Sequence, residues 1–159
     1  MEERTFAQLV DAHADGLFRY ACSLLGDPTE AEDAVQDAFE GLWRHRKSVD
    51  PAKYKSYLYT SVHNRCIDGI RRRKPHLPLH SQSIAASEPA PHDLQEHLHR
   101  GLATLPEKQQ SMVLLRDYEG YSYTEIAAIT GATLETVKVS IFRARRSLRQ
   151  FLGAIENVR

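Results

Sequence analysis

The chain has 159 residues, of which 42% are hydrophobic and 26% are charged, a composition typical of a globular protein with one or two domains. Its 21 basic and 21 acidic residues cancel, but they are unevenly placed. Residues 1–43 hold ten acidic residues against Arg4 and Arg19, a balance of −8, so the remaining 116 residues carry +8. An acidic front on a basic body predicts a protein partner for one part and nucleic acid for the other.

No apolar run approaches the ~18 residues of a membrane-spanning helix, and the N-terminal sequence MEERTFAQ has no signal-peptide core. We therefore expect a cytoplasmic protein without direct membrane insertion. Cys22 and Cys66 lack the CxxC spacing of zinc or redox sites, and we expect them to be buried, reduced thiols.

Two amphipathic helices are predicted first. One spans Phe6 to Leu25 and is ended by Gly26-Asp27-Pro28. The other begins near Thr29, whose side chain could form a capping box with Glu32. The outer face of this second helix is polar and is followed by a partly buried tryptophan: Asp33, Gln36, Asp37, Glu40 and then Trp43. Since acidic residues early in a helix also favour its macrodipole, a merely solvated face explains the pattern equally well.

A third helical segment, Ala52 to Lys74, combines aromatic and basic residues. Three tyrosines in its first turns precede Asn64 and Arg65, and residues 71–74 are all cationic. Aromatic rings can stack on unpaired bases, an amide can contact a base edge and cations can hold the backbone, so the pattern fits single-stranded nucleic acid. It also fits an ordinary amphipathic helix with half-buried tyrosines.

Residues 75–92, PHLPLHSQSIAASEPAPH, contain four prolines and three serines without periodicity, which predicts a flexible linker. Eighteen such residues have an r.m.s. span of roughly 21–25 Å and an extended reach near 60 Å. We therefore expect two halves, 1–74 and 93–159, that move independently and reach separate sites on one duplex. The histidines in and after this stretch show no metal-ligand spacing, so neither metal nor cofactor is expected.

The segment Ser122–Arg146 has the pattern of a helix-turn-helix. Ser122 and Glu125 can form a capping box, and Gly131 can adopt the positive φ of a turn. Thr133 can cap the next helix, in which one face is apolar: Leu134, Val137, Ile141, Ala144 and Leu148. The opposite face is mostly cationic, as in a helix that enters the DNA major groove: Glu135, Lys138, Val139, Phe142, Arg143 and Arg146.

Four motifs in sequence resemble the bacterial RNA polymerase sigma factors of the extracytoplasmic-function (ECF) group. They are TEAEDAVQDAF (29–39) with Trp43, YLY (57–59) with NRCIDGIR (64–71), LPEKQ (105–109), and the helix-turn-helix ending TVK (136–138) and FRAR (142–145). The resemblance covers nearly the whole chain and keeps the family order. It implies an all-α protein of two small helical domains joined by a flexible linker, the second containing the helix-turn-helix.

The resemblance also implies roles for individual residues. The second helix would dock on core RNA polymerase through Asp33, Gln36, Asp37, Glu40 and Trp43. The third segment would melt the promoter −10 element and hold a flipped base, through Lys53, Tyr54, Lys55, Ser56, Tyr57, Asn64, Arg65, Arg71 and Arg72. The helix-turn-helix would contact the −35 element through Thr133, Glu135, Thr136, Lys138, Val139, Phe142, Arg143, Arg146 and Arg149.

Two positions depart from the common family pattern. Val139 and Ser140 follow Lys138 where the family often has a serine and then an arginine, so one expected cation is missing, although Val139 could contact a thymine methyl. Tyr57 stands where a tryptophan is common.

We expect a transcription initiation factor without chemistry of its own, which directs core RNA polymerase to promoter DNA and which an anti-sigma factor could hold. The alternative is a free-standing helix-turn-helix regulator, for which the acidic second helix would have no use. A nucleic-acid enzyme is a third possibility, but the sequence has no metal-ligand set, nucleophile triad or phosphate loop.

Overall fold

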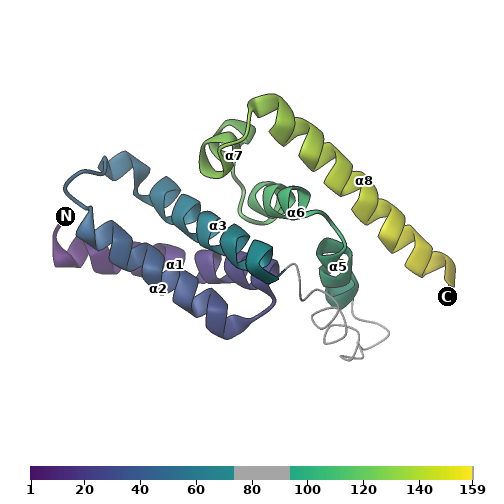
Figure 1. Cartoon of the computed structure of the whole chain (residues 1–159), viewed down its shortest axis with the longest axis horizontal. Helices are drawn as coiled ribbons and strands as arrows, with labels where there is room; N and C mark the ends of the chain where they lie inside the picture. Colours follow the sequence, from purple (N-terminus) through teal and green to yellow (C-terminus); the bar gives the residue numbers. More distant parts are fainter. Residues whose placement is uncertain (74–93, 159) are drawn as a thin grey trace.

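The computed structural model describes residues 1–73 and 94–158, and the predicted linker, residues 75–92, lies outside them. In the first half, α1 (Glu3–Leu25), α2 (Pro28–Arg44) and α3 (Tyr54–Arg73) pack against one another, and a short 3-10 turn, η1 (Pro51–Lys53), precedes α3 (Figure 1). Their shared core is fully buried and includes Leu17, Tyr20, Leu42, Leu58 and Val62.

Short polar and glycine signals set the helix ends, with one difference from expectation. α1 ends at Gly26, whose φ of 72° allows its N–H to reach the Cys22 carbonyl. α2 begins at Pro28, and the cap is Asp27, which accepts a hydrogen bond from the Thr29 N–H at 2.9 Å. The predicted Thr29–Glu32 box is therefore wrong, because proline at the first helical position, Pro28, places the cap at Asp27, two residues before Thr29.

The second half contains α5 (Leu94–Ala103), α6 (Glu107–Val113), α7 (Tyr123–Thr130) and the long α8 (Leu134–Val158). A π-helical turn, η3 (Leu114–Tyr118), extends α6. α8 runs along the outside of this half and packs against α5, α6 and α7 (Figure 1). Its apolar face joins a core that includes Met112, Leu115, Ile126 and Ile141.

The two halves pack against each other, which differs from the independent movement expected from the linker composition. α3 lies against α6 and α7 (Figure 1), and the ring centroids of Tyr59 and Tyr121 are 5.0 Å apart. Gln110 Nε2 donates to the Ser23 carbonyl at 3.0 Å. One hydrophobic core runs through both halves. The linker sequence carries no information about apolar faces elsewhere that can bury one another, so this packing could not be predicted from it.

Among the described residues, no helix has the length and apolar character needed to cross a bilayer.

Candidate nucleic-acid interface

The helix-turn-helix forms as the sequence predicts. Ser122 Oγ accepts from the Glu125 N–H at 3.1 Å while the Glu125 carboxylate accepts from the Ser122 N–H at 2.9 Å, which completes the capping box of α7. α7 ends at Gly131 with φ 77°. Thr133 Oγ1 then accepts from the Thr136 N–H at 3.1 Å and caps α8. These local contacts fix the angle at which α8 leaves the turn.

The outer face of α8 exposes two large apolar side chains among cations. Phe142 is 61% exposed and Val139 is 46% exposed, whereas Val137 and Ile141 on the opposite face are buried. The remaining predicted −35 residues are exposed or half-buried: Thr133, Glu135, Thr136, Lys138, Arg143, Arg146 and Arg149. Exposed aromatic and aliphatic side chains are stabilised when a partner removes them from water, so this face is suited to contact base edges and thymine methyl groups.

Leu134, at the start of α8, was expected in the apolar stripe but is 41% exposed. It belongs to the first turn of α8, which extends past the core that the later turns cover. The correction leaves the helix phase unchanged, because Val137, Ile141 and Ala144 are buried and Leu148 packs against the core.

Arg145 serves a structural purpose on the same helix. Its Nε and Nη2 donate to the two carboxylate oxygens of Asp117 in η3, at 3.0 and 2.5 Å. This bidentate pair raises the pKa of Arg145 above its usual range. Arg145 therefore anchors α8 to η3. Sequence reasoning placed Arg145 in the FRAR motif and missed Asp117, whose spacing of 28 residues gives no local signal.

A depression of about 590 Å³ lies along α3 and the loop before it. Most of the residues that line it have polar side chains, although their apolar atoms also contribute to the surface: Ser48, Val49, Asp50, Lys53, Ser56, Tyr57, Thr60, Ser61 and Asn64. Four of these residues were predicted to contact the −10 element, namely Lys53, Ser56, Tyr57 and Asn64. Thr60 and Ser61 were missed, although their position one turn after Ser56 and Tyr57 places them on the same helix face. Hydroxyls and an amide beside a tyrosine ring are groups that can bind an unpaired base.

The other predicted −10 residues lie elsewhere. Tyr54 is only 7% exposed and packs in the core, so its ring is not presented to a ligand in this structure. Lys55 Nζ sits 4.7 Å from the centre of the Tyr121 ring of the second half. Arg71 Nε is 3.2 Å from Glu107 Oε1, also of the second half.

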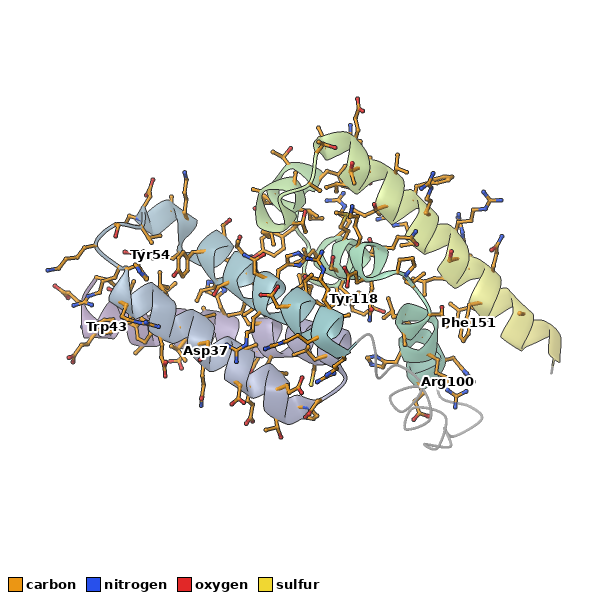
Figure 2. The ribbon with its side chains drawn as sticks, viewed as in Figure 1. Asp37, Trp43, Tyr54, Arg100, Tyr118 and Phe151 are labelled. Atoms are coloured by element: carbon orange, nitrogen blue, oxygen red, sulfur yellow. The ribbon has the colours of Figure 1, made fainter. Side chains whose placement is uncertain are left out.

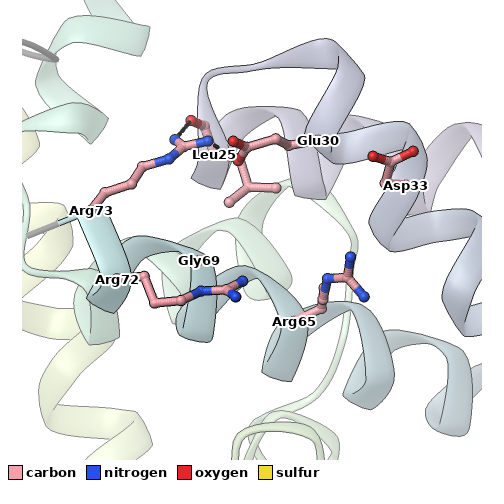
Figure 3. A pocket seen from close by; sticks show the side chains of 7 residues that line it. All are labelled: Leu25, Glu30, Asp33, Arg65, Gly69, Arg72 and Arg73. Atoms are coloured by element: carbon pink, nitrogen blue, oxygen red, sulfur yellow. Dashed lines mark hydrogen bonds and ion pairs between the residues drawn. The ribbon is translucent and has the colours of Figure 1, made fainter.

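A second pocket, of about 320 Å³, opens between the start of α2 and the end of α3 (Figure 3). It mixes three arginines with two carboxylates and is lined by Leu25, Glu30, Asp33, Arg65, Gly69, Arg72 and Arg73. Arg73 pairs with Glu30 and donates to the Leu25 carbonyl at 2.7 Å, which ties α3 to the α1–α2 corner. Arg65 and Arg72 remain at the rim, exposed to solvent.

The predicted docking face of α2 is exposed along its length: Asp33, Gln36, Asp37 and Glu40. Asp37, labelled in Figure 2, pairs with Arg65 of α3. Trp43, at the end of the face, packs with its ring centroid 5.0 Å from that of Phe6, and the Arg46 guanidinium lies 3.9 Å over it. Trp43 therefore ties the end of the α2 face to Phe6 of α1.

The buried titratable groups serve the fold. His63 accepts or donates a hydrogen bond at Nδ1 with the Tyr20 hydroxyl, 2.9 Å away, and burial lowers the pKa of His63 to about 4. Burial likewise raises the pKa of the Cys66 thiol to about 12, so it stays protonated. Within residues 1–73 and 94–158, no three His, Cys, Asp or Glu side chains gather as a metal site.

Comparison with known proteins identifies the family. Residues 9–76 match the Sigma-70 region 2 family and residues 95–148 match Sigma-70, region 4. The chain is 30% identical to the ECF RNA polymerase sigma factor SigW of Bacillus subtilis, covering 95% of this chain and 90% of SigW. It is 34% identical to the ECF RNA polymerase sigma factor SigM of Mycobacterium tuberculosis, over 93% of this chain and 77% of SigM.

A longer relative and two solved structures agree. The ECF RNA polymerase sigma factor SigE of Mycolicibacterium smegmatis is 35% identical over 92% of this chain, which spans 61% of SigE. The sigma factor RpoE of Bartonella quintana, solved with the anti-sigma factor NepR, is 25% identical with a TM-score of 0.76 over 94% of this chain and 98% of that one. CnrH, solved with the cytosolic domain of CnrY, is 26% identical with a TM-score of 0.74 over 96% and 90%. The chain belongs to the ECF RNA polymerase sigma factors, a family of promoter-specific transcription initiation factors.

Proposed function

We propose that this chain binds core RNA polymerase through α2 and directs it to promoters by contacting the melted −10 element with α3 and the −35 duplex with α8. The observation that carries the proposal is the presence in one chain of an acidic exposed helix face and a cationic recognition helix. A free-standing regulator needs only the second. The proposed domains are residues 1–74 for docking and −10 recognition and residues 93–159 for −35 recognition.

The docking role of α2 is supported by its division into two faces. Ala31, Val35 and Ala38 are buried while Asp33 and Asp37 are exposed, so the acidic side chains do not contribute to the core. A negative face of this kind favours a positively charged partner surface and speeds its encounter. We propose that the partner surface belongs to core RNA polymerase.

The −10 role of α3 is supported by the depression beside it. Tyr57 offers a ring face and Asn64 an amide to one unpaired base, while Lys53 at the rim can hold a phosphate. Arg65, the residue after Asn64, and Arg72, about two turns further along α3, are exposed cations that can hold the backbone of the same strand. Tyr54 does not belong to this surface, since it is buried.

The −35 role of α8 is supported by the shape of its exposed face. Lys138, Arg143 and Arg146 flank the apolar pair Val139 and Phe142, and cations of this spacing can contact guanine edges and phosphates. The chain would supply no catalysis, which core polymerase provides, and it would act in the cytoplasm with the chromosome.

An anti-sigma factor is a further proposed partner. Two solved proteins with the same fold are each bound to a protein partner: the sigma factor RpoE to the anti-sigma factor NepR, and CnrH to the cytosolic domain of CnrY. The likeness of this chain to both over more than nine-tenths of its length supports a protein inhibitor of the same class.

The test is reconstitution with core RNA polymerase followed by sequencing of the DNA that the complex protects. We expect co-purification of the chain with core polymerase and one shared pair of −35 and −10 sequences among the protected fragments. Duplex binding without any polymerase association would contradict the proposal and favour a free-standing regulator.

A further inference from the structure

We propose that the packing of α3 against α6 and α7 is a closed state that cannot occupy both promoter elements, and that the Glu119 carboxylate is the latch that holds it. The proposal rests on the function proposed above. The latch consists of Glu119 from the second half and of Gly16, Arg19 and Tyr59 from the first.

Glu119 follows η3, and its side chain is 4% exposed. Arg19 donates to both carboxylate oxygens, from Nε and Nη2 at 3.0 Å each, and the Tyr59 hydroxyl donates to Oε1 at 2.9 Å. All three donors come from α1 and α3, on the other half of the chain. A buried carboxylate is stable only with such partners, because its desolvation is otherwise uncompensated. Loss of a donor therefore favours separation of the halves, which returns Glu119 to water.

Gly16 makes the close approach possible. A Cβ at this position would lie 2.6 Å from Tyr59 Oη, closer than real Cβ atoms approach, and 3.1 Å from Glu119 Oε1, which is tighter than most real Cβ contacts. Gly16 lies in the middle of α1, where glycine costs about 1 kcal/mol of helix stability relative to alanine. The close packing around Glu119 therefore explains the glycine at position 16, whereas helix stability alone would favour alanine.

The closed state covers part of one promoter-binding surface and leaves the other free. Lys55 and Arg71, two of the cations proposed to contact the −10 strand, are engaged by Tyr121 and Glu107 of the second half. In contrast, Phe142 on the −35 face of α8 is exposed. The latch is therefore expected to weaken −10 engagement selectively.

The distance between the promoter elements gives a second reason. Positions −35 and −10 are 25 base pairs apart, which is about 85 Å of duplex at ~3.4 Å per base pair. A compact chain of this length has a radius of gyration of roughly 15 Å and measures about 40 Å across. Residues 74–93 could add a reach of at most about 70 Å if the halves part. Only the open chain can contact both elements.

Two latch variants of the full-length chain, each with a matched control, test the proposal. Arg19→Ala removes the bidentate donor, and Arg4→Ala makes the same charge change at an exposed position of the same helix. Gly16→Ala drives a methyl into the latch without a charge change, and Gly153→Ala adds a methyl where nothing lies within 4 Å. Helical content measured by circular dichroism verifies that each variant is folded.

The first readout is energy transfer between dyes placed at the exposed residues Asp11 of α1 and Gln150 of α8 in the free chain. The second is the chain concentration that half-saturates promoter complexes at a fixed amount of core polymerase. We expect both latch variants to lower energy transfer and to reduce that concentration about tenfold on DNA with both elements, since a closed population reduces apparent affinity. We expect no change on DNA with the −35 element alone, and controls that behave as the original chain.

Energy transfer that stays at its original value in both latch variants would overturn the proposal. The proposal would also be overturned if the latch variants opened but formed promoter complexes on two-element DNA at the same concentration as the original chain. Measurements on the original chain distinguish failure of this proposal from failure of the proposed function. If the original chain formed no promoter complex with core polymerase on any sequence, the proposed function would fail. The energy-transfer measurement would still decide whether Glu119 holds the halves together.

Discussion

The Arg65 guanidinium of α3 pairs with the Asp37 carboxylate of α2, so a residue proposed to contact the −10 strand and a residue proposed to dock on polymerase neutralise each other in the free chain. Both side chains are about half exposed. A pair with this exposure contributes little to stability, roughly 0–1 kcal/mol. Either partner can therefore exchange its contact for one with DNA or polymerase at small cost.

Gln36→Lys is expected to weaken core-polymerase binding about 3- to 10-fold while leaving helical content unchanged. The substitution places a positive charge on the exposed face of α2 without removing the Arg65–Asp37 pair, and a charge at the rim of an interface mainly alters the association rate. Gln8→Lys, at an exposed position of α1, is the control. Surface plasmon resonance at two salt concentrations measures the effect, and equal affinities for the two variants would exclude this face from docking.

Arg143→Ala is expected to cost roughly 1–3 kcal/mol of −35 binding and to relax the preference at one base pair, as for an arginine bidentate to guanine. Arg149→Ala, six residues further along α8, should instead weaken binding equally for all sequences and flatten the salt dependence, as for a phosphate contact. A −35 substitution series with both variants distinguishes the two patterns. A uniform loss for Arg143→Ala would make it a backbone contact.

Asp117→Asn is expected to lower the free energy of unfolding by about 0.5–1 kcal/mol and to weaken −35 binding for every sequence alike. The reason is that the Asp117–Arg145 pair anchors α8 to η3, and both side chains are more than a third exposed, so solvent screens the pair. Urea unfolding gives the stability change. A variant with altered base preference but unchanged overall affinity would show that Arg145 contacts a base.

The free energy of unfolding is expected to fall as the pH drops from about 6.5 to about 4, because of His63. Burial lowers the pKa of His63 to about 4 in the folded chain, whereas the unfolded histidine titrates near 6.5. The unfolded state therefore binds the proton first in this range and is favoured, by up to about 3 kcal/mol at the acidic end.

His63→Gln is the comparison for this acid sensitivity. Since the carboxylates titrate in both chains, the difference between the two stability curves isolates His63. The free energy of unfolding of the original chain minus that of His63→Gln should fall steadily as the pH drops below 6.5. A difference that does not change with pH would mean that His63 has the same pKa in the folded and unfolded chain.

Local sequence signals predicted the helix-turn-helix well because its determinants are close in sequence. The Ser122–Glu125 capping box and the positive φ of Gly131 depend only on neighbouring residues, and both are present. The helix phase of α8 was also correct from Val137 onward. The cap of α2 was misassigned by two residues, since Asp27 and Thr29 are both good capping residues and only Pro28 between them decides.

Long-range pairs could not be predicted. Arg19 and Glu119 are separated by 100 residues, and Arg65 and Asp37 by 28, so no periodicity links them. The family resemblance grouped Tyr54 with the −10 residues, but the structure buries Tyr54 and Tyr59 and places Tyr57 beside the depression. Which tyrosine turns inward depends on the helices packed around α3.

The core shared by both halves also constrains how such proteins can be recombined. A chimera that joined residues 1–73 of this chain to the second half of a relative would have to supply an acidic group opposite Arg19 and an aromatic ring against Tyr59. Without these two groups, Arg19 of the chimera would be unpaired and the apolar surface around Tyr59 would be exposed to solvent. A chimera is therefore expected to keep the closed packing of the halves only if residues 119 and 121 are transplanted together with the recognition helix.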